Sequence, residues 1–119
     1  MELKGTSLIE IKKSKFYGYY YHLDSLEEIK NILSKIKQEN KKAKHIAYAY
    51  KFYNTAGKSD DKEPSGSAGM PLYNILEINN LNDSLLIVVR YFGGIKLGVG
   101  PLTRAYKNTG VMAIHKKKK

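Results

Sequence analysis

The sequence contains no cysteine, which excludes disulfide bonds and metal sites built from thiolates. It has no apolar run approaching the roughly 20 residues that a helix needs to span a bilayer. The first residues, MELKGTSLIEIKK, lack the apolar core of a signal peptide, so we expect a cytoplasmic protein with no membrane partner. No internal repeat or linker divides the 119 residues. We therefore expect one domain over residues 1–115 and a short basic tail, Lys116–Lys119.

Acidic residues are absent after Asp83, although the chain as a whole has 11 of them against 21 lysines and arginines. Four of the ten net positive charges belong to the tail, which we interpret as solvated. The remaining cations of this acid-free third are Arg90, Lys96, Arg104 and Lys107. Phosphate contacts supply most of the sequence-independent affinity in nucleic-acid complexes, so this distribution indicates a nucleic-acid partner.

Arginine is almost absent as well, since the chain has only Arg90 and Arg104. Both flank a glycine-rich stretch, whereas every other cation is lysine. Arginine is favoured where a planar fork must meet a carboxylate or a phosphate. Two interpretations remain open: the arginines bind a phosphate, or each pairs with an acid inside the fold.

The order of apolar patterns predicts an α+β fold. Alternating and aromatic residues predict a hairpin over residues 8–23 with its turn at 12–15. A capping-box signature, Ser25 with Glu28, and helical spacing predict the first helix. This first helix covers residues 26–39. The segments predicted after it are a half-buried strand over 45–53, a polar loop over 54–67, a helix over 68–79, a buried central strand over 84–91 and a last helix that begins near Pro101.

The polar loop contains the only acidic cluster, Asp60, Asp61 and Glu63, followed by Ser65 and Ser67. One interpretation is a divalent-cation site or a general acid and base, with the hydroxyls binding phosphate. The alternative is a turn and a helix N-cap, in which the carboxylates complement the helix dipole or pair with the arginines.

The glycine-rich stretch joins the central strand to the last helix and contains Gly93, Gly94, Gly98 and Gly100. Free N–H groups at a helix N-terminus bind anions, and glycine permits close backbone approach. The stretch matches no nucleotide motif, because Thr103 replaces the last glycine of GxGxxG and Val99 replaces the P-loop lysine. A tight connection that binds no ligand is the alternative.

The histidines and tyrosines suggest no further chemistry. His22, His45 and His115 lack metal-ligand spacing, and we predict no metal site. The tyrosines fit core and sheet-face positions. The alternative is that Tyr17, Tyr19 and Tyr21 stack on bases.

Two segments, DDKEPSGSAGMP and VVRYFGGIKLGVGPLTRAY, resemble the signatures of the IMPACT/YigZ family, and KKSKF and HIAYAY also match family positions. The resemblance covers residues 7–114. It implies a two-layer sandwich of a four-stranded mixed sheet with helices on one face, similar to a small-subunit ribosomal protein domain and to the fourth domain of elongation factor G. Bacterial members usually carry a second, ferredoxin-like domain, and we expect its contribution to be missing. The chain departs from the family pattern at Lys62, Ser67 and Pro101.

Eukaryotic relatives are implicated in translational control through a kinase activator, so the resemblance implies a link to translation. Our first hypothesis is a non-enzymatic module that binds RNA or the ribosome without a cofactor. Its phosphate contacts would be Arg90, Lys96, Arg104 and Lys107, with close backbone approach at Gly93, Gly94 and Gly98.

The second hypothesis is an enzyme for a phosphorylated or nucleotide substrate. Asp61 and Glu63 would then bind Mg²⁺ or act as acid and base, and Asp60, Ser65 and Ser67 would complete that loop of the site. The third is a protein-binding regulator of translation.

Overall fold

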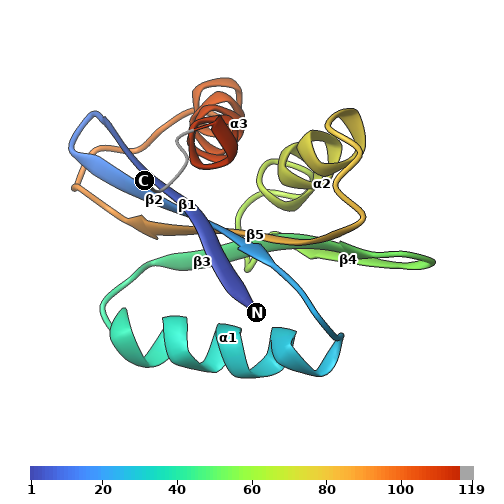
Figure 1. Ribbon diagram of the computed structural model, residues 1–119. Helices are drawn as coiled ribbons and strands as arrows, with labels where there is room; N and C mark the ends of the chain where they lie inside the picture. Colours follow the sequence, from blue (N-terminus) through green and yellow to red (C-terminus); the bar gives the residue numbers. More distant parts are fainter. Residues whose placement is uncertain (116–119) are drawn as a thin grey trace.

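One antiparallel sheet of five strands organises residues 1–115, the part of the chain that the computed structural model describes (Figure 1). The predicted tail lies outside these residues. Neighbouring strands follow the order β1-β2-β5-β3-β4, and each pair is antiparallel. The elements are β1 (Glu2–Ile11), β2 (Ser14–His22), α1 (Glu27–Glu39), β3 (His45–Phe52), β4 (Thr55–Ser59), α2 (Gly69–Ile78), β5 (Asp83–Tyr91) and α3 (Val99–His115).

The α+β class is confirmed, but the predicted four-stranded mixed sheet is wrong in strand number and direction. The missed strand is β4, which lies inside the predicted polar loop. Its sequence, TAGKS, contains no large apolar residue, and β4 pairs only with β3 at the edge of the sheet. An edge strand that buries little needs no alternating apolar pattern, so the pattern gave no sign of it.

Helices cover both faces of the sheet, so the predicted arrangement with helices on one face is also wrong (Figure 1). The reason is visible in β5, whose central residues are all buried. Leu86 and Val88 belong to the core under α2 and α3, whereas Leu85, Ile87 and Val89 belong to the core under α1. A strand that is apolar on both sides requires a covering layer on each side.

The β1–β2 connection is shorter than predicted. It consists of Lys12 and Lys13 alone, both with positive φ (47° and 67°), as in the two-residue turns whose twist matches that of paired strands. Ser14 and Lys15, which were expected in the turn, already belong to β2.

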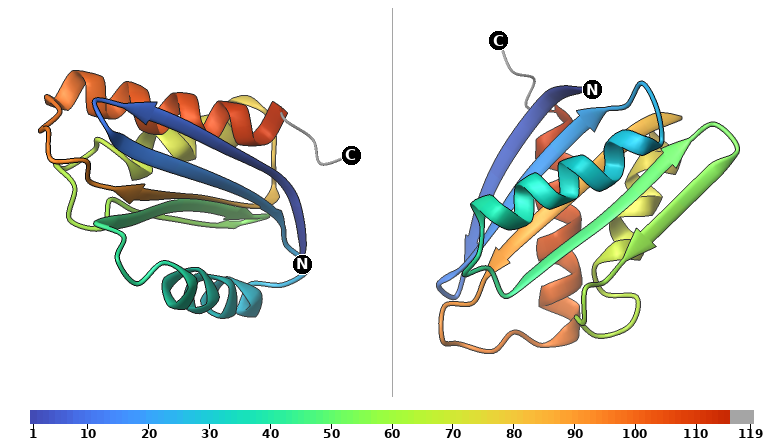
Figure 2. Two further views of the ribbon diagram at one scale, coloured as in Figure 1. Left: turned by 90° about the vertical axis from the view of Figure 1, so that its left-hand side faces the viewer. Right: turned by 90° about the horizontal axis from the view of Figure 1, so that it is seen from below.

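Strand register brings four connections to one end of the sheet, which we call the loop end. Ile11 pairs with Ser14, Lys15 with Tyr91, and His45 with Arg90. Figure 2 shows the same gathering of the β1–β2, α1–β3, β4–α2 and β5–α3 connections. The loop end consists of residues 12–13, 40–44, 60–68 and 92–98. Among residues 1–115, no helix is long and apolar enough to cross a membrane.

Candidate functional site

A buried ion pair underlies the loop end. Nη1 of Arg90, at the end of β5, donates to both carboxylate oxygens of Glu63, at 2.9 and 2.8 Å. The two residues are only 6% and 7% exposed. Of the two interpretations left open for Arg90, the structure therefore shows an inward pairing with an acid.

Glu63 also accepts a hydrogen bond from the hydroxyl of Tyr106 on α3. Burial, and then this hydrogen bond, raise the pKa of Tyr106 far above its ordinary value, so its phenol remains a donor. His45 completes the cluster, with Nε2 at 3.4 Å from Glu63 Oε1 and Nδ1 at 2.6 Å from the backbone oxygen of Asp61. The backbone oxygen of Asp61 can only accept, so Nδ1 of His45 is the donor in that contact.

The other two acids of the loop organise backbone. Asp60 Oδ1 accepts from the N–H groups of Ala68 and Gly69 at the start of α2, and its Oδ2 accepts from Gly66. Burial alone would raise the pKa of Asp60, but these three donors outweigh it and lower the pKa. Asp61 Oδ2 accepts from Ile46 N at 2.6 Å.

The acidic loop therefore has the geometry of a turn and helix cap. Ser67 is buried and donates to the backbone oxygen of Pro64, whereas Ser65 is exposed. Within residues 1–115, no group of three His, Cys, Asp or Glu side chains is arranged to hold a metal ion. The capping interaction was one of the two interpretations drawn from the sequence.

The glycines of the β5–α3 connection have different tasks. A Cβ on Gly93 would lie 2.1 Å from the backbone carbon and oxygen of Lys13, so this position lets the β5–α3 loop pack against the β1–β2 turn. Gly94 has a φ of +91°. By contrast, a Cβ on Gly98 or Gly100 would meet nothing closer than 3.7 or 3.5 Å.

The remaining predicted cations face solvent. Lys96 lies in the loop before α3, and Arg104 and Lys107 lie on the exposed face of α3. The atom nearest to a Cβ on Gly100 would be Arg104 Nη1, so the Arg104 side chain lies beside the first turn of its own helix. The structure thus separates the two arginines, one buried and one exposed.

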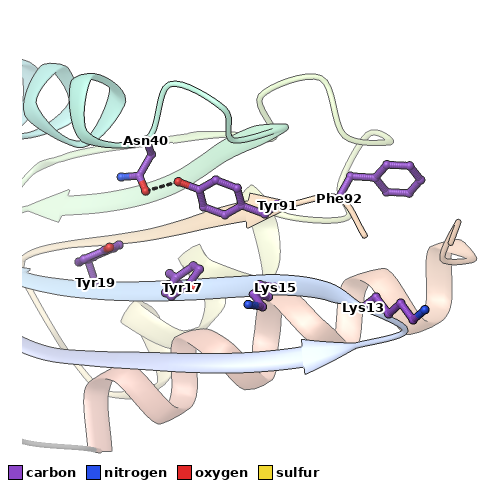
Figure 3. Close-up of a pocket in the computed structure, with 7 residues that line it drawn as sticks. All are labelled: Lys13, Lys15, Tyr17, Tyr19, Asn40, Tyr91 and Phe92. Carbon is purple, nitrogen blue, oxygen red and sulfur yellow. Dashed lines mark hydrogen bonds between the residues drawn. The ribbon is translucent and has the colours of Figure 1, made fainter. Parts of the chain in front are cut away.

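Two cavities open at the loop end, and Phe92 lines both. The first, of about 260 Å³, is lined by Lys44, Glu63, Pro64, Arg90, Phe92, Lys96, Leu97 and Leu102. The second, of about 460 Å³, is lined by Lys13, Lys15, Tyr17, Tyr19, Asn40, Tyr91 and Phe92 (Figure 3). In Figure 3, Tyr17 and Tyr19 follow β2, and Tyr91 donates to Asn40 from the neighbouring strand. Tyr21, the third tyrosine considered for stacking, is buried.

Sequence reasoning missed several residues that line these cavities or complete the cluster. Phe92 is 44% exposed, and an exposed aromatic between an arginine and two glycines could have indicated a binding surface. His45 and Tyr106 both occur in the segments singled out for their family resemblance. Their contact with Glu63 was not predictable, because it depends on three segments distant in sequence.

Fold and site together define an α+β domain whose loop end has a buried acid–arginine–tyrosine cluster beneath a rim of lysines. Residues 12–114 match the family described as the Impact N-terminal domain. The chain belongs to the IMPACT family, which confirms the resemblance seen in the sequence.

An IMPACT family member of Haemophilus influenzae is 44% identical over 108 residues, which are 83% of this chain and 50% of that protein. The crystal structure of a hypothetical protein superposes with a TM-score of 0.92 at 33% identity, over 98% of this chain and 59% of the other. The structure of the two-domain translational regulator Yih1 gives a TM-score of 0.59 at 22% identity, over 93% and 47%, and shows a shared fold. The chain spans about half the length of the curated relatives that it matches first.

Proposed function

We propose that this domain is a non-enzymatic module that binds RNA, free or in the ribosome, and acts in the regulation of translation. Membership of the IMPACT family and the shared fold with a protein described as a translational regulator support the second half of this proposal. The arrangement of charge at the loop end supports the first half.

The observation that carries this proposal is that exposed cations from separate segments converge on the loop end, while the acids of its 60–68 loop are paired. Glu63 is buried, and Asp60 and Asp61 are half-buried and accept from backbone N–H groups. Lys13, Lys44 and Lys96 are exposed and come from three different connections. The carboxylates of the 60–68 loop are occupied by backbone N–H groups, by Arg90 and by Tyr106. Exposed acids nearby are Glu10 and Glu39, which the cations outnumber. A cationic surface with an exposed aromatic residue suits a single-stranded nucleic acid.

The phosphate contacts are Lys96 at the loop end, and Arg104 and Lys107 on the exposed face of α3, the helix that follows it. Gly94 and Gly98 present exposed backbone that a sugar-phosphate chain can approach. Arg90 lies below this surface and supports it, because its ion pair with Glu63 holds the 60–68 loop against the end of β5.

The test is the salt dependence of binding to a short single-stranded oligoribonucleotide, measured by fluorescence anisotropy between about 50 and 200 mM salt. The double variant Lys96→Gln/Arg104→Gln should bind more weakly. The slope of the logarithm of the binding constant against the logarithm of the salt concentration should decrease in magnitude by about 0.7 for each lost contact with a single strand. The matched control is Lys4→Gln/Lys30→Gln, which removes the same charge from exposed positions in β1 and in the first half of α1. Equal slopes for the two double variants would overturn the assignment.

A further inference from the structure

Only one of the three guanidinium nitrogens of Arg90 makes hydrogen bonds with the described residues. Of its three nitrogens, Nη1 makes both hydrogen bonds to Glu63. Nε is buried and has no partner, and Nη2 makes no hydrogen bond with the described residues. Buried donors without a partner are rare in folded proteins, and one on a charged group is costly. The Nε and Nη2 donors of arginine form the planar edge that commonly receives a phosphate with two hydrogen bonds.

The 260 Å³ cavity lies against this residue. Arg90 and Glu63 are its buried lining residues together with Leu102, and Lys44 and Lys96 contribute exposed ammonium groups. The start of α3, just beyond Gly98, adds the positive end of a 17-residue helix. These features together favour an acceptor with more than one negative charge.

Glu63 is the only carboxylate that lines this cavity, and its charge is compensated. It faces Arg90 Nη1, the Tyr106 hydroxyl and, at 3.4 Å, His45 Nε2. The two lysines are therefore not matched by a free acid among the residues that line the cavity. An incoming anion would supply the missing counter-charge.

The size and the lining of the cavity limit which ligands can fit it. Its volume is several times that of a water molecule, ~30 Å³, but lies below the ~300–1,000 Å³ of sites for whole drug-sized ligands. Phe92, Leu97 and Pro64 form an apolar side. One phosphate group with its attached sugar fits this combination, since the sugar can lie on the apolar side while the phosphate meets the cations.

We propose that this cavity binds the terminal phosphate of an RNA chain, with the free edge of Arg90 and the ammonium groups of Lys44 and Lys96 as donors. A terminal phosphomonoester carries about −1.5 to −2 charges at neutral pH and has only one chain attached to it. An internal phosphate carries a single charge and has chain on both sides. This inference rests on the proposed RNA binding and adds a preference for phosphorylated ends.

The test compares RNAs of one sequence that carry a 5′-phosphate, a 3′-phosphate or hydroxyl groups at both ends. Affinity is measured by isothermal titration calorimetry on the full chain. One of the phosphorylated RNAs should bind about tenfold more tightly than the hydroxyl form, as expected for a gain of charge-assisted hydrogen bonds. Inorganic phosphate should compete away this advantage.

Two variants locate the effect. Arg90→Lys keeps a cation opposite Glu63 but removes the Nε and Nη2 edge, and it should abolish the preference. Lys44→Gln changes an exposed side chain without touching the ion pair, and it should reduce the preference even if Arg90→Lys fails to fold. The control Lys4→Gln should retain it.

The outcomes separate this inference from the proposed function. Equal affinity of all three RNAs, with normal salt dependence, would overturn the terminal-phosphate site and leave RNA binding standing. A preference that survives in Lys44→Gln and in folded Arg90→Lys would also overturn it. Absence of binding to every RNA would instead overturn the proposed function. Tighter binding of a phosphoserine peptide than of either phosphorylated RNA would reject RNA as the ligand of the cavity.

Discussion

Arg90 and Glu63 form a buried ion pair in which one nitrogen of the guanidinium, Nη1, serves both carboxylate oxygens. The residues are separated by 27 positions in the chain, and their pairing fastens the loop before α2 to the end of the central strand. Burial makes the pair demanding, because a charge that loses its partner remains in a poorly solvating environment.

Glu63→Gln should therefore lower the free energy of unfolding by about 3 kcal/mol, since it leaves the buried guanidinium without its counter-charge. Urea unfolding followed by circular dichroism measures the change. The matched control is Glu2→Gln, at an exposed position, with an expected effect within about 0.5 kcal/mol. If the two variants lost similar free energy of unfolding, the loss would come from removing a negative charge and not from breaking the ion pair.

Tyr106 should make the protein sensitive to alkali. Because its pKa is raised in the folded state, its contribution to stability is complete below the unfolded value of 10.0 and declines as pH rises above that value. Tyr106→Phe should lower stability at neutral pH by about 1 kcal/mol and should make the alkaline decline shallower. The exposed Tyr53 provides the control, Tyr53→Phe. Urea unfolding at a series of pH values tests this, and identical alkaline slopes for the two variants would contradict it.

Much of the fold could be predicted because it depends on local pattern. The helices α1 and α2 and the strand β5 lie within one residue of their predicted bounds. The capping box predicted at the start of α1 is present only in part. Glu28 accepts from the backbone of Asp24 and Ser25, but the Ser25 hydroxyl makes no cap.

The failures are nonlocal. The strand β4 exists because β3 offers it an edge, and two helical layers exist because β5 is apolar on both faces. The sequence also could not show whether Arg90 binds a phosphate or pairs with a carboxylate of the protein. It depends on the register that sets Arg90 opposite His45 and on the path of the 60–68 loop toward the same end.

Asp60 should be an acid-sensitive helix cap. Its pKa is lowered in the folded state, so its contribution is complete above the ordinary value of 3.8 and is lost as pH falls through and below that value. Asp60→Ala should cost about 1 kcal/mol or more at neutral pH, because the N–H groups of Ala68 and Gly69 lose their acceptor. Asp60→Asn keeps an acceptor and should recover much of this loss. Urea unfolding at neutral pH and at pH values below 3.8 measures both effects, and equal stability of wild type and Asp60→Ala would contradict them.

Gly93→Ala and Gly98→Ala should differ although both add one methyl group to the same loop. At Gly93 the new Cβ would overlap the backbone of Lys13 at 2.1 Å, and neither backbone can move as a flexible side chain can. The β1–β2 turn or the β5–α3 loop must shift, with an expected cost of about 1–3 kcal/mol. At Gly98 the nearest atom would be 3.7 Å away, so the change should stay within about 0.5 kcal/mol.

The same pair of variants tests whether the shared wall of the two cavities matters for binding. Phe92 precedes Gly93 and lines both cavities, and Lys13 lines one of them. A displaced loop should therefore weaken RNA binding strongly in Gly93→Ala at a temperature where the variant is still folded. Gly98→Ala adds a methyl group to the proposed binding surface without displacing the loop, so it should weaken binding less. Unfolding in urea and anisotropy titrations on the same samples measure both effects. If Gly93→Ala lost stability but kept full affinity, the contact between the loop and the turn would serve the fold alone.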